Sequence, residues 1–376
     1  MVRPMTSPLA ALCPGLDRTL RPLPILDRPT PVQHLERLGR AVGKRELWVK
    51  RDDLSNAEYG GNKPRKLSWL LADAIQNDRR TLVTAGAIGS HHVLATSLFG
   101  RKLGLQVCAL LTPQPVSVHV RRNLAAHAAL ETEVHLVRRA ADLPFALART
   151  MAAKTAFLDR PALILPGGSS PVGVLGFVDA GLEFAAQVRE GVCPRPAAVV
   201  VPCGSGGTAA GLALGFALAG LSAPVVGVRV VPRAWLPSWL PWLIAQATAA
   251  LLARHGLPSA LRAAAGLRLR VDDRWLGEGY GVPTSAGQMA LERFAELERL
   301  RLDPTYTSKA AAAFLGLAAE ARSADEPLVF WLTLSAAEPP GAGSDPSAFL
   351  GLPPEFHCFF RDEPERRNVR RWRRDG

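Results

Sequence analysis

Apolar residues are spaced along this chain in two patterns, short continuous runs and longer stretches with helical spacing. Continuous runs predict buried strands, and apolar positions that recur every three or four residues predict helices. Their alternation favours parallel sheets covered by helices on both faces, an α/β fold. Strands are expected at 47–51, 81–84, 106–111, 133–137, 162–165, 197–202, 224–231 and 327–333, and helices at 93–103, 117–131, 139–154, 173–190, 285–300 and 308–322, with further helices after residue 63 and between residues 208 and 219.

Two stretches depart from this alternation. Residues 1–43 are rich in proline and show little periodicity, so they are expected to wrap around the fold rather than to enter its core. Residues 236–253 carry no charge, but prolines and polar side chains interrupt them, and a membrane-spanning helix needs about 20 mostly apolar residues. This stretch is therefore expected to form a buried helix that starts near Pro241, and no membrane association is predicted.

The composition is that of a globular protein, because 48% of the 376 residues are apolar and 21% are charged. This length allows two domains or one large α/β unit. The five cysteines are far apart and form no Cys-x-x-Cys pair, so neither a zinc site nor a disulfide framework is predicted. Because the N-terminal residues do not resemble a signal peptide, the cytoplasm is the expected location.

The formal net charge of +12 raises the alternative of a nucleic-acid or acidic partner. Residues 361–376 contain seven arginines, which four acidic residues partly offset. Trp372 is the one aromatic residue in this tail, whereas single-stranded nucleic acids are commonly bound on several aromatic side chains. A solvated tail is therefore favoured, and no nucleic-acid binding is predicted.

The first candidate chemistry lies in Gly-Gly-Asn-Lys-Pro-Arg-Lys-Leu at residues 60–67. Pro64 suits the first turn of a helix and apolar residues follow at helical spacing, so Lys63 is expected at the mouth of a packed helix. The glycines before it allow a backbone or a ligand to approach closely. A lysine in this position can act as a nucleophile on a carbonyl group. The alternative is a solvated first turn in which Lys63, Arg65 and Lys66 all face water.

A second glycine-rich stretch, Cys-Gly-Ser-Gly-Gly-Thr at residues 203–208, joins a predicted buried strand to a predicted helix. The backbone N–H groups of such a turn and the helix dipole favour a phosphate. Its spacing differs from that of a Walker loop and from that of a dinucleotide site. The alternative is a tight turn without a ligand. A phosphate cradle combined with a poised lysine points to pyridoxal 5'-phosphate, a phosphorylated aldehyde held as a Schiff base.

Further motifs follow the same order as these two stretches. They are Lys-Arg-Asp-Asp-Leu at 50–54, Leu-Val-Thr-Ala-Gly-Ala-Ile-Gly-Ser at 82–90, Pro-Gly-Gly-Ser at 166–169, Gly-Tyr-Gly-Val-Pro at 279–283 and Asp-Pro-Thr-Tyr-Thr-Ser-Lys at 303–309. Together, over residues 20–333, the motifs resemble the D-cysteine desulfhydrase / 1-aminocyclopropane-1-carboxylate deaminase family of pyridoxal-phosphate enzymes.

The resemblance implies a tryptophan-synthase-β-like fold, with two doubly wound open sheets and the cofactor cleft between them. It also implies a homodimer. The expected domains are a large cofactor-binding domain at 1–55 and 166–338, a smaller α/β domain at 56–165, and a C-terminal extension rich in proline and arginine at 339–376.

Individual roles also follow from the resemblance. Lys63 would bond to the cofactor and then move protons at the Cα of a small amino-acid substrate. Ser90 would lie over the substrate carboxylate or act in catalysis, and Tyr280 and Tyr306 would face the substrate. The alternative for the two tyrosines is an ordinary place in the core. The expected catalytic set is Lys63, Ser90, Tyr280 and Tyr306, and the expected cofactor-binding set is Asn62, Lys63, His91, Gly204, Ser205, Gly206, Gly207, Thr208 and Thr307, with no metal.

The residue after Tyr306 distinguishes two branches of the family. The deaminase type carries a glutamate near the pyridine nitrogen, the desulfhydrase type carries a threonine, and Thr307 stands here. A glutamate keeps the ring nitrogen protonated and makes a strong electron sink, whereas a hydroxyl leaves a weaker sink that is adequate for β-elimination. The expected reaction is α,β-elimination of D-cysteine to pyruvate, ammonia and sulfide, and 1-aminocyclopropane-1-carboxylate deaminase-like activity is the alternative.

The chain departs from the family pattern at three places. His91 stands where an asparagine usually contacts the phenolic oxygen of the cofactor, and its ring can donate a hydrogen bond there. Ser308 replaces a glycine, and Leu-Thr-Leu-Ser at 332–335 replaces His-Thr-Gly-Gly, which removes two glycines that let the backbone approach the cofactor. These departures leave open a relative that binds the cofactor with altered or lost catalysis.

Overall fold

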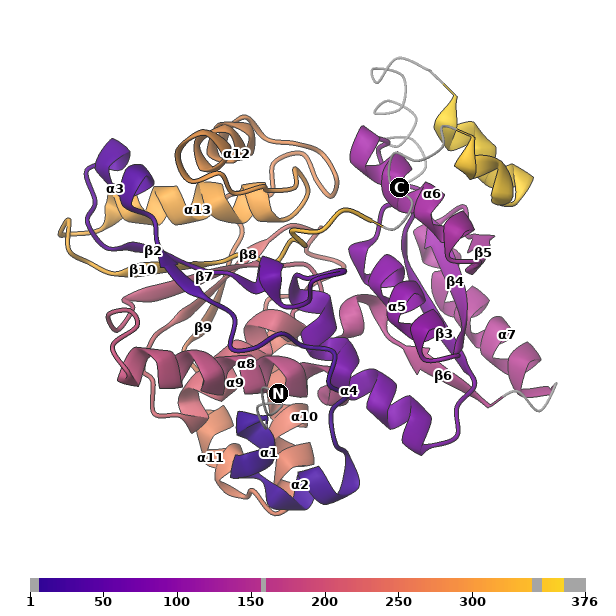
Figure 1. The fold of residues 1–376 in the computed structure, drawn as a ribbon, viewed down its shortest axis with the longest axis horizontal. Coiled ribbons are helices and arrows are strands. Elements are labelled where there is room, and N and C mark those ends of the chain that lie inside the picture. The colour runs from indigo at the N-terminus through magenta and orange to yellow at the C-terminus, as the bar shows by residue number, and fades with distance from the viewer. Residues whose placement is uncertain (1–6, 157–159, 340–346, 362–376) are drawn as a thin grey trace. The chain divides into compact units, whose positions relative to one another are not determined.

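The computed structural model describes residues 7–156, 160–339 and 347–361 (Figure 1). The chain forms two compact units: unit 1 comprises residues 1–73 and 168–337, and unit 2 comprises residues 74–167 and 338–376. The first change of unit falls inside helix α4 (Asn62–Gln76), not at residue 55 as the sequence predicted. The first part of α4 belongs to unit 1 because Trp69 packs against Leu175 in the core of that unit.

Unit 1 is built on a six-stranded sheet with the order β1-β2-β10-β7-β8-β9. Its strands are β1 (Val32–His34), β2 (Leu47–Lys50), β7 (Ala198–Cys203), β8 (Val225–Arg229), β9 (Leu269–Asp272) and β10 (Leu328–Trp331). β1 pairs with β2 in the antiparallel sense, and all other neighbours pair in parallel. β7 is buried along its whole length, as expected of a central parallel strand with helices on both faces.

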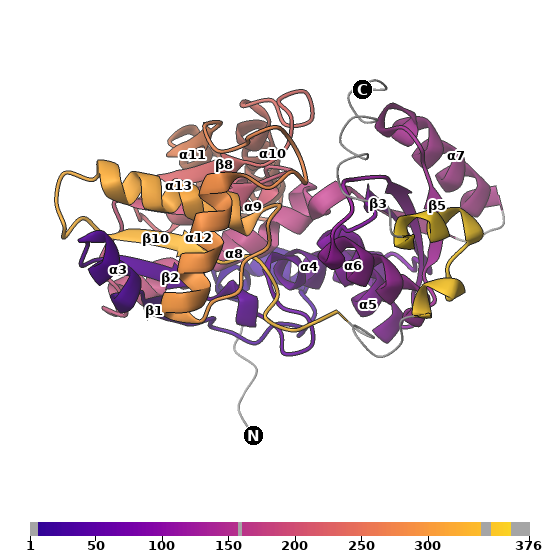
Figure 2. The same ribbon diagram turned by 90° about the horizontal axis from the view of Figure 1, so that it is seen from above.

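Helices cover both faces of this sheet (Figures 1 and 2). One face carries α3 (Glu36–Val42), α12 (Ser285–Glu298) and α13 (Thr307–Glu320), and the other carries α8 (Pro171–Arg189) and α9 (Gly207–Leu218). A further layer next to α8 and α9 consists of α1 (Pro8–Leu12), α2 (Pro14–Thr19), α10 (Leu240–Arg254) and α11 (Ser259–Ala265). Consecutive residues of β10 serve the two faces, because Phe330 packs on Phe294 at 5.4 Å and Trp331 packs on Phe184 at 5.6 Å between ring centroids.

Unit 2 is built on a four-stranded parallel sheet with the order β5-β4-β3-β6. Its strands are β3 (Thr81–Ala87), β4 (Gln106–Thr112), β5 (Glu133–Leu136) and β6 (Pro161–Ile164). α5 (His91–Lys102) and α6 (Val118–Ala129) cover one face, and α7 (Leu143–Ala156) covers the other. The short 3-10 helices η4 (Ala348–Gly351) and η5 (Pro354–Phe360) bring Leu352 and Phe356 into the core beside α6.

The expectation that residues 1–43 stay outside the core is wrong. This segment contains α1, α2, β1 and α3, and the side chains of Leu9, Leu16 and Leu38 are fully buried. Prolines stand at the first positions of α1 and α2, where a missing N–H group costs no hydrogen bond. The prolines that obscured the pattern therefore begin two of these helices.

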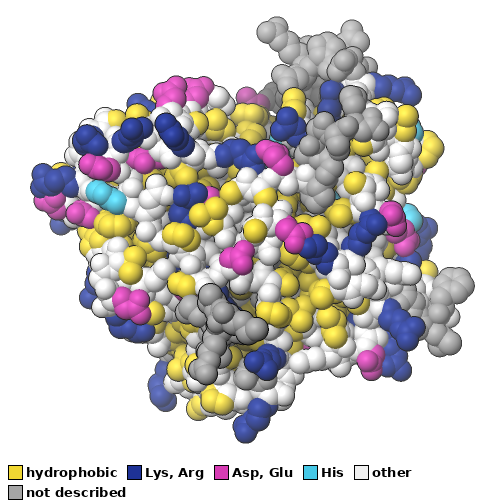
Figure 3. All heavy atoms as spheres, in the orientation of Figure 1, with side chains coloured by type: hydrophobic (Ala, Val, Ile, Leu, Met, Phe, Trp, Pro, Cys, Tyr) yellow, Lys and Arg dark blue, Asp and Glu magenta, His cyan; other side chains and the backbone are white. Residues whose placement is uncertain are grey.

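The C-terminal extension predicted at 339–376 is compact where the structure describes it, since residues 347–361 pack within unit 2. Most of the arginine-rich tail, residues 362–376, lies outside the described residues. On the face drawn in Figure 3, lysine and arginine side chains are dispersed and often lie beside acidic ones.

Among the described residues, α8 is the one helix whose length and apolar composition match those of a membrane span. In the structure, 78% of its most apolar window is buried, because α8 packs against the sheet and against α9. The uncharged stretch at 236–253 forms α10 from Leu240 onward, close to the predicted start at Pro241. α10 is buried along one face only, and Trp242 and Leu243 are exposed.

Candidate active site

The turn that precedes Lys63 is held by two segments of unit 1 that are far apart in the sequence, at Asp52 and at residues 333–335. Gly61 has a φ of 83°, and a Cβ atom on it would lie 2.5 Å from the carbonyl oxygen of Thr333, so only glycine fits. The Gly61 N–H donates to the Asp52 carbonyl at 2.8 Å, and the Gly60 N–H donates to Ser335 Oγ at 3.0 Å. The Asn62 N–H donates to the Thr333 carbonyl at 3.1 Å, so the turn is held by Thr333, which matches the family pattern, and by Ser335, which departs from it.

Lys63 lies in the first turn of α4, and its Nζ donates to Asn62 Oδ1 at 2.7 Å. Burial lowers the pKa of Lys63 to about 8, and the charge of Asp303 only partly opposes this effect. Near neutral pH roughly a tenth of the side chain is therefore the neutral amine, far more than for an ordinary lysine. Because only the neutral amine attacks an aldehyde, the lowered pKa of Lys63 favours its predicted role.

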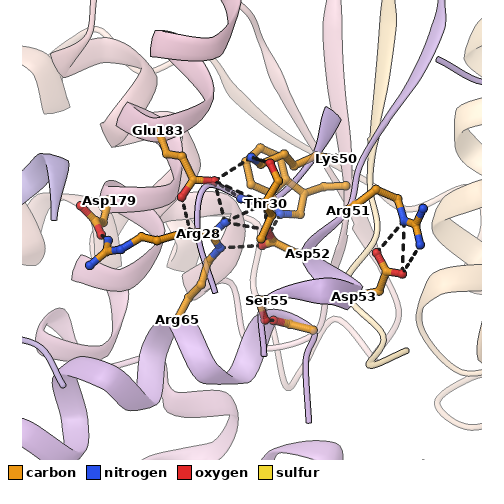
Figure 4. Close-up of polar contacts among 12 residues, drawn as sticks. Arg28, Thr30, Lys50, Arg51, Asp52, Asp53, Ser55, Arg65, Asp179 and Glu183 are labelled. Carbon is orange, nitrogen blue, oxygen red and sulfur yellow. Dashed lines mark hydrogen bonds and ion pairs between the residues drawn. The ribbon is translucent and has the colours of Figure 1, made fainter. Parts of the chain in front are cut away.

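The alternative of a solvated first turn is wrong. The side chain of Arg65 is fully buried and that of Lys66 is 2% exposed. Arg65 forms two ion pairs, with Asp52 at 2.7 Å and with Glu183 at 2.9 Å (Figure 4). Asp52 lies just after the end of β2 and Glu183 lies in α8, so these contacts join the start of α4 to both elements.

The ion pairs of Arg65 belong to a larger buried network (Figure 4). Lys50 Nζ donates to Glu183 Oε1 at 2.6 Å, and the Trp331 indole donates to Asp52 Oδ2 at 2.7 Å. Burial alone would lower the pKa of Arg65, but the charges of Asp52 and Glu183 outweigh it and raise that pKa. Burial would likewise raise the pKa of Glu183, but Arg65 and Lys50 hold it well below its usual value. Arg65 and Glu183 are therefore ionised, and each stabilises the charge of the other.

The glycine-rich loop joins β7 to α9 in the way a phosphate site requires. Gly206 occupies the N-cap position of α9 with a φ of 85°, and no side chain among the described residues caps this helix start. The Ser205 hydroxyl lies 2.7 Å from Ser169 Oγ, and Asn62 Nδ2 donates to Thr208 Oγ1 at 3.2 Å. The loop thus presents uncapped N–H groups and hydroxyls, and a hydrogen bond connects it to the turn of Lys63.

Lys66 brings a cation to this loop, which the sequence reasoning missed. Its Nζ donates to Ser169 Oγ at 3.1 Å, and a Cβ atom on Gly207 would lie 3.0 Å from Nζ. Burial and then the charge of Lys63 lower the pKa of Lys66 well below its usual value. A phosphate dianion placed here would offset both effects. The residues present therefore fit a phosphorylated aldehyde, with an amine for the aldehyde and a cationic, hydroxyl-lined cradle for the phosphate.

Tyr280 and Tyr306 meet next to the loop. Their hydroxyl oxygens lie 2.7 Å apart, and a Cβ atom on Gly204 would lie 3.3 Å from Tyr306 Cε1. Burial raises the pKa of Tyr280 to about 12, and burial together with Tyr280 raises the pKa of Tyr306 well above its usual value. Both phenols are therefore protonated at neutral pH, and one of the two hydroxyls donates to the other. Both rings also pack against a hydrophobic core cluster, so the alternative of an ordinary place in the core stays open.

Thr307 is fully buried, and its hydroxyl donates to Asp303 Oδ2 at 2.6 Å. The same carboxylate accepts the backbone N–H groups of Thr305, Tyr306 and Thr307, at 2.9, 2.6 and 3.0 Å. Asp303, which had no predicted role, thereby orders the start of α13. The predicted contact of Thr307 with the pyridine nitrogen stays a prediction.

Lys309 performs a similar task for the loop that carries Tyr280. Its side chain is fully buried, and Nζ donates to the carbonyl oxygens of Leu276 and Gly279 at 2.7 and 2.8 Å. Because Lys309 and Tyr306 both lie at the start of α13, these two bonds hold Tyr280 in place beside Tyr306.

Ser90 and His91 lie in unit 2, at the start of α5. Ser90 is the N-cap of this helix and accepts the N–H of Val93 at 3.4 Å. His91 Nε2 lies 2.7 Å from His119 Nε2, so one of the two rings donates to the other. The structure thus brings the predicted residues of unit 1 together, whereas the roles of Ser90 and His91 at the cofactor stay predictions.

The fold and the lysine-centred site define a pyridoxal-phosphate dependent enzyme. The family model described as "Pyridoxal-phosphate dependent enzyme" matches residues 24–333, and the chain belongs to that family. The predicted cofactor and fold class are thereby confirmed.

Comparison with individual proteins shows which members of this family the chain resembles. The D-cysteine desulfhydrase of Salmonella schwarzengrund (strain CVM19633) is 38% identical over 317 residues, which cover 82% of this chain and 92% of the relative. The crystal structure of an ACC deaminase homologue has a TM-score of 0.74 and 26% identity, and the match covers 89% of this chain and 96% of that one. The processed form of threonine deaminase isoform 2 from Solanum lycopersicum, with a TM-score of 0.53 and 18% identity over 86% of this chain and 82% of that one, is similar in fold alone.

Proposed function

We propose that this enzyme eliminates sulfide from D-cysteine and releases pyruvate and ammonia. The observation that carries the proposal is the 38% identity to a D-cysteine desulfhydrase over nearly the whole of that relative. Thr307, in place of a glutamate at the ring nitrogen, supports the same branch of the family. The lowered pKa of Lys63 supports its predicted covalent role.

The cofactor would be held at its two ends by residues of unit 1. Lys63 would bond to its aldehyde carbon, and the N–H groups of Gly206, Gly207 and Thr208 would bind its phosphate together with the hydroxyl of Ser205. Lys66 would supply the neighbouring positive charge. When bound, pyridoxal phosphate supplies an electron sink that stabilises negative charge at the substrate Cα.

The remaining steps are proton transfers and hydrogen bonds made by the protein. Lys63 Nζ would remove the proton from the substrate Cα, because it lies in the site with a pKa of about 8. Tyr280 and Tyr306 stay protonated, so neither would act as a base. One hydroxyl donates to the other, and the one whose proton is not used in that bond would donate to the sulfur that leaves Cβ. Ser90 would bind the substrate carboxylate, and His91 would donate to the phenolic oxygen of the cofactor.

The test is an absorbance spectrum of the purified protein before and after addition of D-cysteine. The wild-type protein is expected to show a visible Schiff-base band that changes with D-cysteine while pyruvate and sulfide appear. Lys63→Ala is expected to lack the band. A band that persists without product formation would contradict the proposed substrate, and a band that survives in Lys63→Ala would contradict the proposed role of Lys63.

The second candidate is 1-aminocyclopropane-1-carboxylate deaminase-like activity, which the likeness to the ACC deaminase homologue favours. Release of 2-oxobutyrate from 1-aminocyclopropane-1-carboxylate, without pyruvate from D-cysteine, would select it. Spectral changes with neither substrate would indicate altered or lost catalysis, in keeping with His91, Ser308 and the changed residues at 332–335.

A homodimer in the cytoplasm is part of the same proposal, and light scattering of the purified protein tests the dimer.

A further inference from the structure

A row of aromatic side chains leads outward from the glycine-rich loop in unit 1. Tyr306 lies against Gly204 and contacts Tyr280, with 5.8 Å between ring centroids. Tyr280 in turn contacts Trp235, with 6.0 Å between ring centroids. The two tyrosines are largely buried, whereas the side chain of Trp235 is 54% exposed. The row therefore ends in an indole that offers apolar surface beside the ring of Tyr280, whose hydroxyl is proposed to face the substrate.

The segment that carries Trp235 is anchored to the site. Arg229, fully buried at the end of β8, donates to the carbonyl oxygen of Leu236 and, at 2.8 Å, to Ser238 Oγ. Leu236 and Pro241 close over the loop, because a Cβ atom on Gly206 would lie 3.3 Å and 3.1 Å from them. The indole is thus held next to Tyr280 by a fixed backbone, which limits the ordering cost of binding a ligand against it.

A thiol group alone does not need such a surface. The sulfur of D-cysteine is a single heavy atom, and the Tyr280–Tyr306 hydroxyl pair already offers it a donor. A substituent on that sulfur would extend further along the row. Such a substituent would then contact the exposed face of Trp235, because aromatic and apolar groups gain binding free energy by packing against a large ring.

From this continuity, we propose that Trp235 is a specificity-determining residue that binds the substituent of S-substituted cysteines, and that the enzyme cleaves apolar or aromatic members of this class. The inference rests on the proposed function. In the overall reaction, R–S–CH2–CH(NH3+)–COO− and water give R–SH, pyruvate and ammonium. The Cβ–S bond breaks, the sulfur leaves with the bonding electrons and takes up a proton, and hydrolysis releases the amino group.

The experiment compares Trp235→Ala with a matched control, Trp239→Ala, in the holoenzyme. Trp239 lies in the same segment and is 61% exposed, and no ring contact with Tyr280 is found for it among the described residues. S-Phenyl-D-cysteine and D-cysteine serve as substrates, with pyruvate as the product measured. Trp235→Ala is expected to lower the ratio of kcat/KM for S-phenyl-D-cysteine to that for D-cysteine by about tenfold, and Trp239→Ala to leave the ratio unchanged.

A binding measurement gives a readout that does not depend on turnover. D-Homophenylalanine carries a methylene in place of the sulfur of S-phenyl-D-cysteine, and D-2-aminobutyrate does the same for D-cysteine. Calorimetric titration of the holoenzyme is expected to show tighter binding of D-homophenylalanine, with about tenfold loss of that preference in Trp235→Ala. The larger analogue should retain its advantage in Trp239→Ala.

Three results would overturn the inference: wild-type enzyme that does not prefer D-homophenylalanine, an equal loss of preference in both variants, or a Trp235→Ala variant whose main change is its oligomeric state. The last would make the tryptophans an interface between copies of the chain. Failure of the proposed function looks different, because then neither D-cysteine nor S-phenyl-D-cysteine yields pyruvate, while the preference for D-homophenylalanine and its loss in Trp235→Ala persist.

Discussion

The first turns of α4 carry buried cations in two contrasting environments. Arg65 faces the network of Figure 4 and forms ion pairs with Asp52 and Glu183, which raise its pKa. Lys63 and Lys66 face the glycine-rich loop, where their ammonium groups donate to amide and hydroxyl oxygens and where burial lowers the pKa of each.

The difference shows how one helix start can be both rigid and reactive. On the Arg65 side, opposite charges in direct contact stabilise the ionised groups and fix the helix to the sheet. On the loop side, neutral acceptors stabilise the ammonium groups less, so a proton is lost more easily there and an added anion would be stabilised. The predictions below separate these two environments.

Arg65→Met should have the largest effect on stability. It would leave Asp52 and Glu183 buried without their shared cation, and breaking a buried ion pair in this way costs about 3–5 kcal/mol. Urea unfolding measures the loss. Arg45→Met is the control, because Arg45 and Asp325 form an ion pair whose side chains are 70% and 55% exposed, and water screens such a pair so that it contributes little to stability. Equal losses of stability in the two variants would mean that the buried carboxylates of Asp52 and Glu183 do not depend on Arg65.

Lys66→Gln should weaken cofactor binding rather than folding. A hydrogen bond to a charged group contributes about 1.5–3 kcal/mol, so the Kd for pyridoxal phosphate should rise roughly 10- to 100-fold. Equilibrium dialysis against apoprotein measures this Kd. Lys44→Gln, which removes an ammonium group that donates to the Ala321 carbonyl at 3.1 Å, should leave it unchanged. An unchanged Kd in Lys66→Gln would remove Lys66 from the phosphate cradle.

The pH dependence of cofactor uptake should report the lowered pKa of Lys63. Only the neutral amine attacks the aldehyde, so the rate constant for apoprotein reconstitution should rise about tenfold per pH unit and level off near pH 8. Stopped-flow absorbance measures the rate. Asp303→Asn should move this inflection to lower pH, because the charge of Asp303 raises the pKa of Lys63. An inflection near pH 10 would mean that burial does not act on Lys63.

Ser335→Ala should have the smallest effect. It removes the acceptor of the Gly60 N–H, a hydrogen bond that contributes about 1 kcal/mol to folding. Ser323→Ala, which removes an exposed hydroxyl that accepts the N–H of Asp325 at 3.1 Å, should cost less. Urea unfolding of both variants tests the order, and the reverse order would mean that Ser335 does not hold the turn.

Most of the strands and helices were predictable because the central parallel strands are buried on both sides and appear as continuous apolar runs. β7 and β4 are examples, with bounds within one or two residues of those expected. Family, fold class and cofactor followed from the order of the motifs and are confirmed. The N-terminal helices were missed because they are short and begin at prolines, which look like breakers in sequence.

The site was predictable only as far as each residue lay in a recognisable motif. Lys66 and Ser169 are both in motifs, yet their contact joins segments 103 residues apart, and no local spacing reveals it. Asp303 was overlooked because its role is to accept hydrogen bonds from the start of α13, a function that appears only once the helix boundary is known. Burial of Arg65 and Lys66 could not be read from a basic run that resembles a solvated turn.

The place of β10 in the sheet has a consequence for synthesis on the ribosome. β2 pairs on one side with β10, and the turn before Lys63 is bonded to Thr333 and Ser335. A nascent chain that has reached residue 300 therefore contains the lysine and the glycine-rich loop but not the backbone that fixes the lysine. The backbone arrangement around Lys63 is therefore completed only after residues 328–335 have been added to the chain.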